Sequence, residues 1–192
     1  NVVSNYLAST FNDVATYSGE RVWSEDNTSI NNIVVLRAIR TKNGNGEICG
    51  EFDVTEPVKL EIDYQVLIDG YQLCAGVHFV NNKDEWLFYA PDDYVNSSWG
   101  KQPTKKIGIH RATYTVPGNL FQDGTIKIHV GIFPPPAEPS KASSLVNEKN
   151  IFTFSMIDSF NKNGVRGNYP FNWGSPALRP AIECNSKFLG DL

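Results

Sequence analysis

The sequence is poor in the features by which proteins bind polyanions. Among its 192 residues, 17 are basic and 21 are acidic, which gives a net charge of −4 at pH 7. No run is rich in lysine or arginine, and proteins that neutralise a phosphate backbone need such clusters. We therefore expect that nucleic acid is not a ligand of this chain.

Long apolar runs and cysteines are scarce as well. No stretch approaches the roughly 20 apolar residues of a membrane-spanning helix, and the start, NVVSNYLAST, lacks the charged and then apolar segments of a signal peptide. The cysteines, Cys49, Cys74 and Cys184, are widely spaced and odd in number. This pattern favours thiols in a reducing compartment over a disulfide framework, so we expect a soluble domain in the cytoplasm.

Methionine occurs once, at Met156. Because Asn1 is not a translation start, we expect the chain to be a piece of a longer polypeptide. Its length suits one sizeable hydrophobic core and is too short for two ordinary domains. With 41% hydrophobic and 20% charged residues, the composition is that of a folded globular domain.

The usual signatures of catalysis and nucleotide binding are missing. The sequence has no G-x-x-x-x-G-K-[ST], G-x-G-x-x-G, G-x-S-x-G, H-E-x-x-H or C-x-x-C, the motifs of phosphate cradles, hydrolase nucleophiles and zinc sites. His78, His110 and His129 lie on separate expected strands without ligand spacing. We expect no cofactor, no metal ion and no enzymatic activity in this chain.

The sequence does contain a series of short segments in which apolar and polar residues alternate. In 58–66, VKLEIDYQV, apolar residues occupy every second position and polar residues the positions between them. This pattern predicts a strand with one buried face. Further strands are expected at 30–42, 73–80, 85–90, 106–116, 125–133 and 150–158, and the NGNG run at 43–46 predicts a tight turn.

Regular short strands with turn residues between them predict an all-β fold. We expect an antiparallel β-sandwich of immunoglobulin-like or jelly-roll-like type, formed by residues 30–192. Residues 1–29 are expected to be a short helix or a linker from a preceding domain. The last segment, with its prolines and glycines, is expected to form an extended C-terminal arm.

Aromatic residues gather around one expected strand and the loop that follows it. They are Trp86, Phe88, Tyr89, Tyr94 and Trp99. Because Trp86 and Phe88 share a face of the expected strand, we assign both to the core, where a sandwich usually buries a tryptophan. The other three are candidate platforms for a sugar, since sugars pack their C–H faces on flat rings. The alternative for these three is ordinary loop packing.

Polar side chains on neighbouring strands extend this candidate site. His78, Arg111 and His129 each adjoin apolar residues that are expected to face the core, so the three are expected to face outward. An arginine can also bind an acidic sugar or a phosphate. The candidate carbohydrate-binding residues are His78, Tyr89, Tyr94, Trp99, Arg111 and His129. The alternative for each histidine is an ordinary packed or surface position.

Two functions of other classes compete with sugar binding. Glu85 with Asp92 or Asp93 could serve a glycan-modifying sandwich enzyme, because two carboxylates roughly 5 to 10 Å apart suffice for glycoside hydrolysis. Loop solvation or turn capping is the alternative for the Asp92–Asp93 pair. The domain could also be an immunoglobulin-like module whose partner is a protein.

The segment 165–180, VRGNYPFNWGSPALRP, carries a resemblance to a known family. It is similar to the closing signature of the C-terminal domain on the ATPase subunit of bacterial ABC exporters of O-antigen polysaccharide. The matching residues are Arg166, Gly167, Trp173, Gly174, Arg179 and Pro180. The segments VVSNYL, RVWSED, IVVLRAIRTKNGNG and VPGNLFQDGTIKIHVGIF resemble the family in the same order, whereas AIEC after the Arg-Pro pair departs from it.

The resemblance implies a β-sandwich that binds the non-reducing end of the finished glycan and selects it for export. It also implies a homodimer that exchanges its last strand in some members, and an exporter complex on the cytoplasmic side of the inner membrane. Pro176 and Pro180 hold the chain extended, which suits an arm that reaches a partner. Alternatively, the arm folds over its own sandwich, tied down by Arg166 and Arg179.

Overall fold

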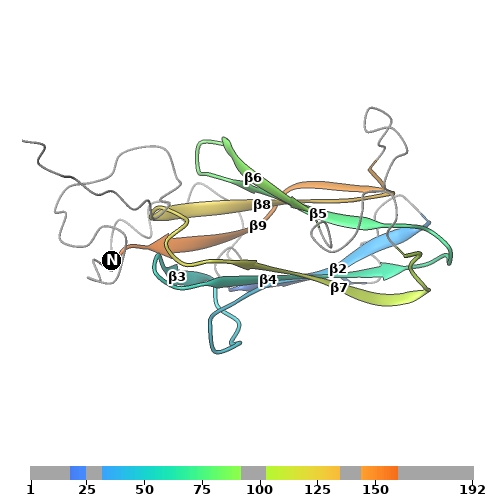
Figure 1. The fold of residues 1–192 in the computed structure, drawn as a ribbon, viewed down its shortest axis with the longest axis horizontal. Coiled ribbons are helices and arrows are strands. Elements are labelled where there is room, and N and C mark those ends of the chain that lie inside the picture. Colours follow the sequence, from blue (N-terminus) through green and yellow to red (C-terminus); the bar gives the residue numbers. More distant parts are fainter. Residues whose placement is uncertain (1–17, 25–31, 92–102, 135–143, 160–192) are drawn as a thin grey trace, which may run out of the picture.

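The computed structural model describes residues 18–24, 32–91, 103–134 and 144–159. Within these ranges, all regular structure is β, arranged in two layers (Figure 1). The strands are β1 (Glu20–Val22), β2 (Val34–Lys42), β3 (Glu51–Asp53), β4 (Val58–Val66), β5 (Cys74–Val80), β6 (Trp86–Pro91), β7 (Gly108–Val116), β8 (Gly124–Phe133) and β9 (Val146–Ile157). No helix in the described part of the chain is long and apolar enough to cross a membrane.

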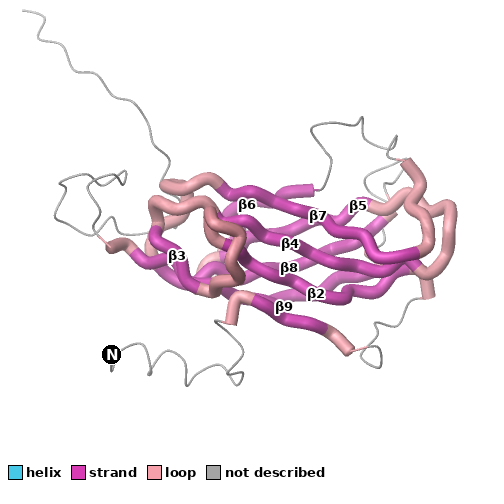
Figure 2. The backbone as a smooth tube through the Cα atoms, turned by 90° about the horizontal axis from the view of Figure 1, so that it is seen from below, coloured by secondary structure: helices cyan, strands magenta, loops and turns pink. Residues whose placement is uncertain are grey.

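The strands form two packed sheets. One has the order β1-β2-β4-β7 and the other has the order β3-β9-β8-β5-β6. Figure 2 shows the long strands running side by side along the molecule. The predicted β-sandwich is confirmed, with one correction: β3 pairs with β9 in parallel, while the other described strand pairs are antiparallel. β3 follows β2 in the chain but belongs to the other sheet. There it pairs with β9, so the β3–β9 pair joins segments that are far apart in sequence.

The core lies between the inner faces of the two sheets. In β4 the alternation read from the sequence is confirmed, because Val58, Leu60, Ile62, Tyr64 and Val66 are all at most 1% exposed. From the facing sheet, the core receives the apolar residues of β5, β8 and β9, among them Val77, Phe79, Ile126, Ile128, Val130, Ile132, Phe152 and Phe154.

The turn predicted at 43–46 is present. The side-chain oxygen of Asn43 accepts hydrogen bonds from the backbone N–H groups of Asn45 and Glu47, and Gly46 has a φ of 83°. Only glycine adopts this left-handed conformation without steric cost. The turn therefore depends on an asparagine acceptor and on a glycine without a Cβ atom.

Two short strands were not predicted. β3 and β1 have three residues each, too few to show an alternation. β1 falls in the segment expected to be a linker, yet it pairs with β2 and reaches the other sheet through Arg21, whose Nη1 donates to the carbonyl of Ile151 at 2.8 Å. The expected N-terminal helix and the C-terminal arm lie outside the described residues.

Candidate functional site

The outer face of the five-stranded sheet brings together three of the residues predicted for the site. The register pairs Tyr89 of β6 with His78 of β5, and His78 with His129 of β8. The neighbours of His78 along β5, Val77 and Phe79, are fully buried in the core. Since side chains alternate along a strand, the three residues form one row across the outer face.

Trp86 also lies on this outer face, which corrects its assignment to the core. Its side chain is 66% exposed. The cause is a register shift: Phe79 pairs with Phe88, but Val80 pairs with Trp86, which leaves Leu87 as an extra residue. Such a bulge reverses the alternation of a strand, so Leu87 and Phe88 both pack against the core while Trp86 turns outward. The assignment of Phe88 to the core is confirmed.

The rings on this face are in mutual contact. The ring centroids of His78 and Trp86 are 4.2 Å apart, and those of His78 and Tyr89 are 4.5 Å apart, with interplanar angles of 43° and 34°. Tyr89 is 39% exposed. We call Trp86, His78, Tyr89 and His129 the aromatic–histidine row. Trp86 and Tyr89 present their rings to the solvent, His78 lies half-buried between them, and His129 is only 9% exposed.

Two glycines leave space on the strands beside the row, and the ring of Tyr89 fills the space over one of them. Gly76 and Gly131 lie opposite each other in the ladder between β5 and β8. A Cβ atom at Gly76 would come within 2.1 Å of the Oη atom and 2.6 Å of the Cζ atom of Tyr89. The phenol ring therefore lies flat over the Gly76 backbone, and any larger residue there would displace it.

His129 is held in place by β9. Its Nε2 atom lies 2.8 Å from Oδ1 of Asn150, and with the amide in this orientation the imidazole donates the hydrogen bond. Asn150 has a φ of 51° and lies in an irregular part of β9 between the pairs Ile128–Phe152 and Val130–Glu148. The bulge brings Asn150 beside the row, a position that strand periodicity alone does not predict.

The buried cation on this face is already neutralised. Lys127 is 7% exposed, and its Nζ atom lies 2.6 Å from Oδ1 of Asp84 and 3.5 Å from the carbonyl oxygen of Asn82. Within the row, His78 is neutral near pH 7. Burial lowers the pKa of His78 below its ordinary value of 6.5, and repulsion from His129 lowers it further.

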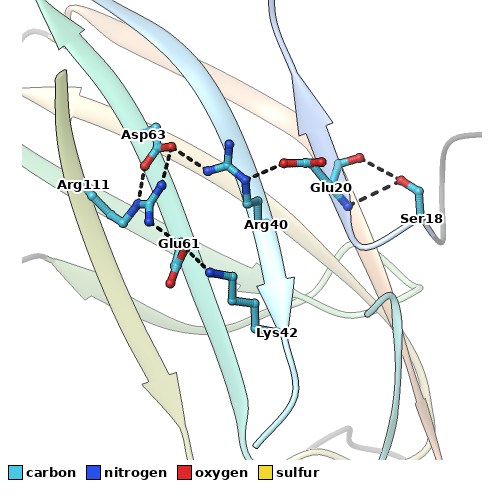
Figure 3. A network of polar contacts seen from close by, with 7 residues as sticks. All are labelled: Ser18, Glu20, Arg40, Lys42, Glu61, Asp63 and Arg111. Carbon is cyan, nitrogen blue, oxygen red and sulfur yellow. Dashed lines mark hydrogen bonds and ion pairs between the residues drawn. The ribbon is translucent and has the colours of Figure 1, made fainter. Parts of the chain in front are cut away.

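Arg111 lies on the other sheet, away from the row. It belongs to β7, where its Nε and Nη2 atoms donate to the two carboxylate oxygens of Asp63 at 2.6 and 2.8 Å (Figure 3). Its Nη1 atom is 3.2 Å from Glu61. A guanidinium held by two carboxylates has little left to offer a ligand, and the structure thus separates this predicted residue from His78, Tyr89 and His129.

The network around Arg111 spans the outer face of the four-stranded sheet. Arg40 binds both Asp63 and Glu20, and Lys42 binds Glu61 at 2.9 Å (Figure 3). Hydrogen bonds from Arg111, and then from Arg40, hold the pKa of Asp63 below its ordinary value despite its burial. Burial alone would raise the pKa of Glu61, but Lys42 and Arg111 together lower it. The acidic residues of this network, Glu20, Glu61 and Asp63, are each paired with a cation.

The carboxylate of the alternative enzyme site has a structural role. Glu85 lies in the turn between β5 and β6, where its Oε2 atom accepts a hydrogen bond from Nδ2 of Asn81 at 2.6 Å. Its expected partners, Asp92 and Asp93, lie outside the described residues. Within the described ranges, no group of three His, Cys, Asp or Glu side chains could hold a metal ion.

Some predicted residues cannot be placed on either face. Tyr94 and Trp99 lie outside the described residues. So do the residues of the family signature, Arg166, Gly167, Trp173, Arg179 and Pro180. The sequence-based prediction missed Trp86, Asn150 and the Gly76–Gly131 pair. The one signal for Trp86 was the unbroken apolar run WLFYA, in which strict alternation fails.

A comparison with solved structures gives a match over nearly the whole chain. The crystal structure of the C-terminal domain of wzt aligns with a TM-score of 0.63 and 10% sequence identity, and the alignment covers 90% of this chain and 92% of that one. The match shows that the two chains share a fold, and it confirms the resemblance seen in the sequence. Comparisons with family models and with curated proteins gave no match.

Proposed function

We propose that this chain is a non-catalytic carbohydrate-binding domain. It recognises a cell-surface polysaccharide of the O-antigen type, at its non-reducing end, and thereby selects the finished polymer for export by an ABC transporter. The aromatic–histidine row is the observation that carries the proposal. A binding surface for sugar needs flat rings and planar polar groups within reach of each other, and the row supplies both on one exposed sheet face.

The likeness of folds supports the exporter part of the proposal. The sequence resembles domains that follow the ATPase of O-antigen exporters, and a solved domain with the same fold is the C-terminal domain of wzt. The full protein would carry its ATPase domain before Asn1 and would sit with the exporter subunit at the cytoplasmic side of the inner membrane. By the same resemblance, the domain would act as a homodimer.

The chemistry of the site predicts weak binding by each domain. Hydroxyl groups exchange hydrogen bonds with water for hydrogen bonds with protein, so each contributes only about 1 kcal/mol net. The two sites of a dimer, tethered to one exporter, would raise the effective affinity by proximity. Weak single sites also suit a domain that must release the polymer for transport.

The test is a titration of the chain with the polysaccharide of its own cell, followed by calorimetry or tryptophan fluorescence. We expect saturable binding. Trp86→Ala should weaken it about fivefold, because loss of ring stacking costs roughly 1 kcal/mol. Ile109→Ala is the matched control, since Ile109 is 62% exposed on the opposite sheet. Equal affinity of wild type, Trp86→Ala and Ile109→Ala would refute this binding face.

The loop after β6 provides a further test. Tyr94 and Trp99 are proposed as additional platforms, because they follow the strand that carries Trp86 and Tyr89. Tyr94→Ala or Trp99→Ala should weaken binding and leave the melting temperature nearly unchanged. If instead the chain released reducing ends from the polysaccharide, and Glu85→Gln abolished this release, the enzyme hypothesis would replace the binding one.

A further inference from the structure

His78 stands out within the row because its imidazole makes no hydrogen bond in the described part of the chain. Its ring contacts the rings of Trp86 and Tyr89, and its Nδ1 atom is buried without a hydrogen-bond partner. The other two histidines differ: His129 bonds Asn150, and His110 lies 2.8 Å from the carbonyl oxygen of Lys106. A buried polar atom without a partner costs about 1–3 kcal/mol.

A phenylalanine would fill this position between the rings without that cost. The ring nitrogens therefore need an explanation that packing does not give. The imidazole is neutral near pH 7 because burial and His129 lower its pKa, so it has one N–H donor and one nitrogen acceptor. A hydroxyl group can both donate and accept, and it is the complementary partner for such a ring.

The charged side chains beside the row include both acidic and basic residues. Lys127 is paired with Asp84, and in β9 the exposed residues Glu148 and Lys149 are neighbours of opposite charge. Arg111, the guanidinium predicted to bind an acidic group, is bound to Asp63 on the other sheet. A carboxylate or a phosphate would gain little at this face, because recognition of an anion needs uncompensated positive charge.

We infer that the row binds an uncharged sugar residue. One hydroxyl group of this sugar hydrogen-bonds to the imidazole of His78, and the sugar ring packs against Trp86 and Tyr89. The inference rests on the proposed carbohydrate-binding function and names the chemistry of its ligand. His78 is then a specificity-determining residue. A sugar that lacks this hydroxyl would leave the ring nitrogen unpaired and would be rejected.

The first experiment separates binding from packing at His78. His78→Phe keeps an aromatic ring and removes both nitrogens, so we expect about fivefold weaker binding of the glycan, which corresponds to one lost hydrogen bond. We expect its melting temperature to rise, because the unpaired nitrogen is gone. His78→Gln keeps a donor and an acceptor and should bind more tightly than His78→Phe.

The opposite results would overturn the inference. If His78→Phe binds as tightly as the wild type, no ligand hydrogen bond reaches the imidazole. If His78→Phe loses binding together with thermal stability, the ring serves the fold and not the recognition of a hydroxyl group.

The second experiment tests the class of sugar with an array of immobilised oligosaccharides. The array carries neutral hexose and N-acetylhexosamine termini, beside matched oligosaccharides that end in a uronic acid or a phosphate. Binding to neutral termini supports the inference. Binding confined to acidic termini contradicts it and leaves the proposed function standing. Binding to neither set, nor to the polysaccharide of the cell itself, counts against the proposed function.

Discussion

At the scale of single residues, two outer faces of one sandwich use polar chemistry in opposite ways. On the four-stranded sheet, Asp63 and Glu61 are nearly buried and each is matched by cations. On the five-stranded sheet, His78 has rings around it and an unpaired nitrogen. Paired charges stabilise a fold, whereas the imidazole of His78 keeps hydrogen-bonding capacity that no group in the described part of the chain uses.

Gly76 gives a direct test of the platform. Gly76→Ala places a methyl group 2.1 Å from the present position of the Tyr89 hydroxyl oxygen, so the ring must move off the backbone and away from its contact with His78. We expect weaker glycan binding, by about fivefold, with a small loss of stability because the clash is with the end of a flexible side chain. Gly44→Ala is the control for an added methyl group, because it lies in a distant turn where the methyl group would meet only a side-chain atom of Pro57, at 4.0 Å. Unchanged binding by Gly76→Ala would show that the Tyr89 ring does not belong to the site.

Because the pKa of Asp63 is lowered in the folded chain, we expect the free energy of unfolding to depend on pH. Its pKa is lower in the folded chain than in the unfolded chain, chiefly through the hydrogen bonds from Arg111. The ionised form therefore stabilises the fold at pH above the unfolded value of about 3.9, and this contribution is lost as the pH falls through the folded value. Asp63→Asn should remove about 2 kcal/mol of stability at pH 7 and should flatten the acid limb of the curve.

Urea denaturation at a series of pH values would measure this effect. Glu56→Gln is the control, because Glu56 is exposed and has no ion pair in the described structure. If Asp63→Asn and Glu56→Gln had the same stability at pH 7, the network of Figure 3 would contribute nothing to the fold.

At the scale of strands, periodicity predicts the long elements and fails at irregularities. The strand expected at 58–66 is observed as Val58–Val66, because one face is buried and the other polar along its whole length. The outward positions of His78 and His129 follow from the same rule. Trp86 and Asn150 escape prediction, because each lies at a bulge whose position depends on pairing between strands. Arg111 is separated from the row because β7 belongs to the other sheet. The residue pattern of a single strand does not show to which sheet that strand belongs.

Strand order also predicts which strands open first. β4 and β8 each have a neighbour on both sides and bury alternate side chains in the core, whereas β1 and β3 are three-residue strands at the ends of their sheets. We expect amide hydrogen exchange to be slowest in β4 and β8 and fastest in β1 and β3. Slow exchange throughout β1, matching that of β4, would contradict this order of stability.

At the scale of the whole molecule, the two faces should respond differently to salt. Screening weakens ion pairs at exposed positions, so the four-stranded face loses some of its stabilisation at high ionic strength. The proposed binding face relies on ring packing and neutral hydrogen bonds, and its flanking charges balance. Glycan affinity should therefore change less than about twofold between 0.05 and 1 M sodium chloride. A tenfold loss, measured by calorimetry, would mean that an uncompensated charge carries the binding.

The central claim is that one outer face of the sandwich holds the polysaccharide. The most direct measurement is a titration of the isotope-labelled chain with polysaccharide fragments, followed by NMR chemical shifts. We predict that the shifts of Trp86, His78, Tyr89 and His129 move together as the site saturates, while those of Arg111 and the rest of the four-stranded face stay constant. Shifts confined to the four-stranded face, or none at saturating glycan, would contradict the account.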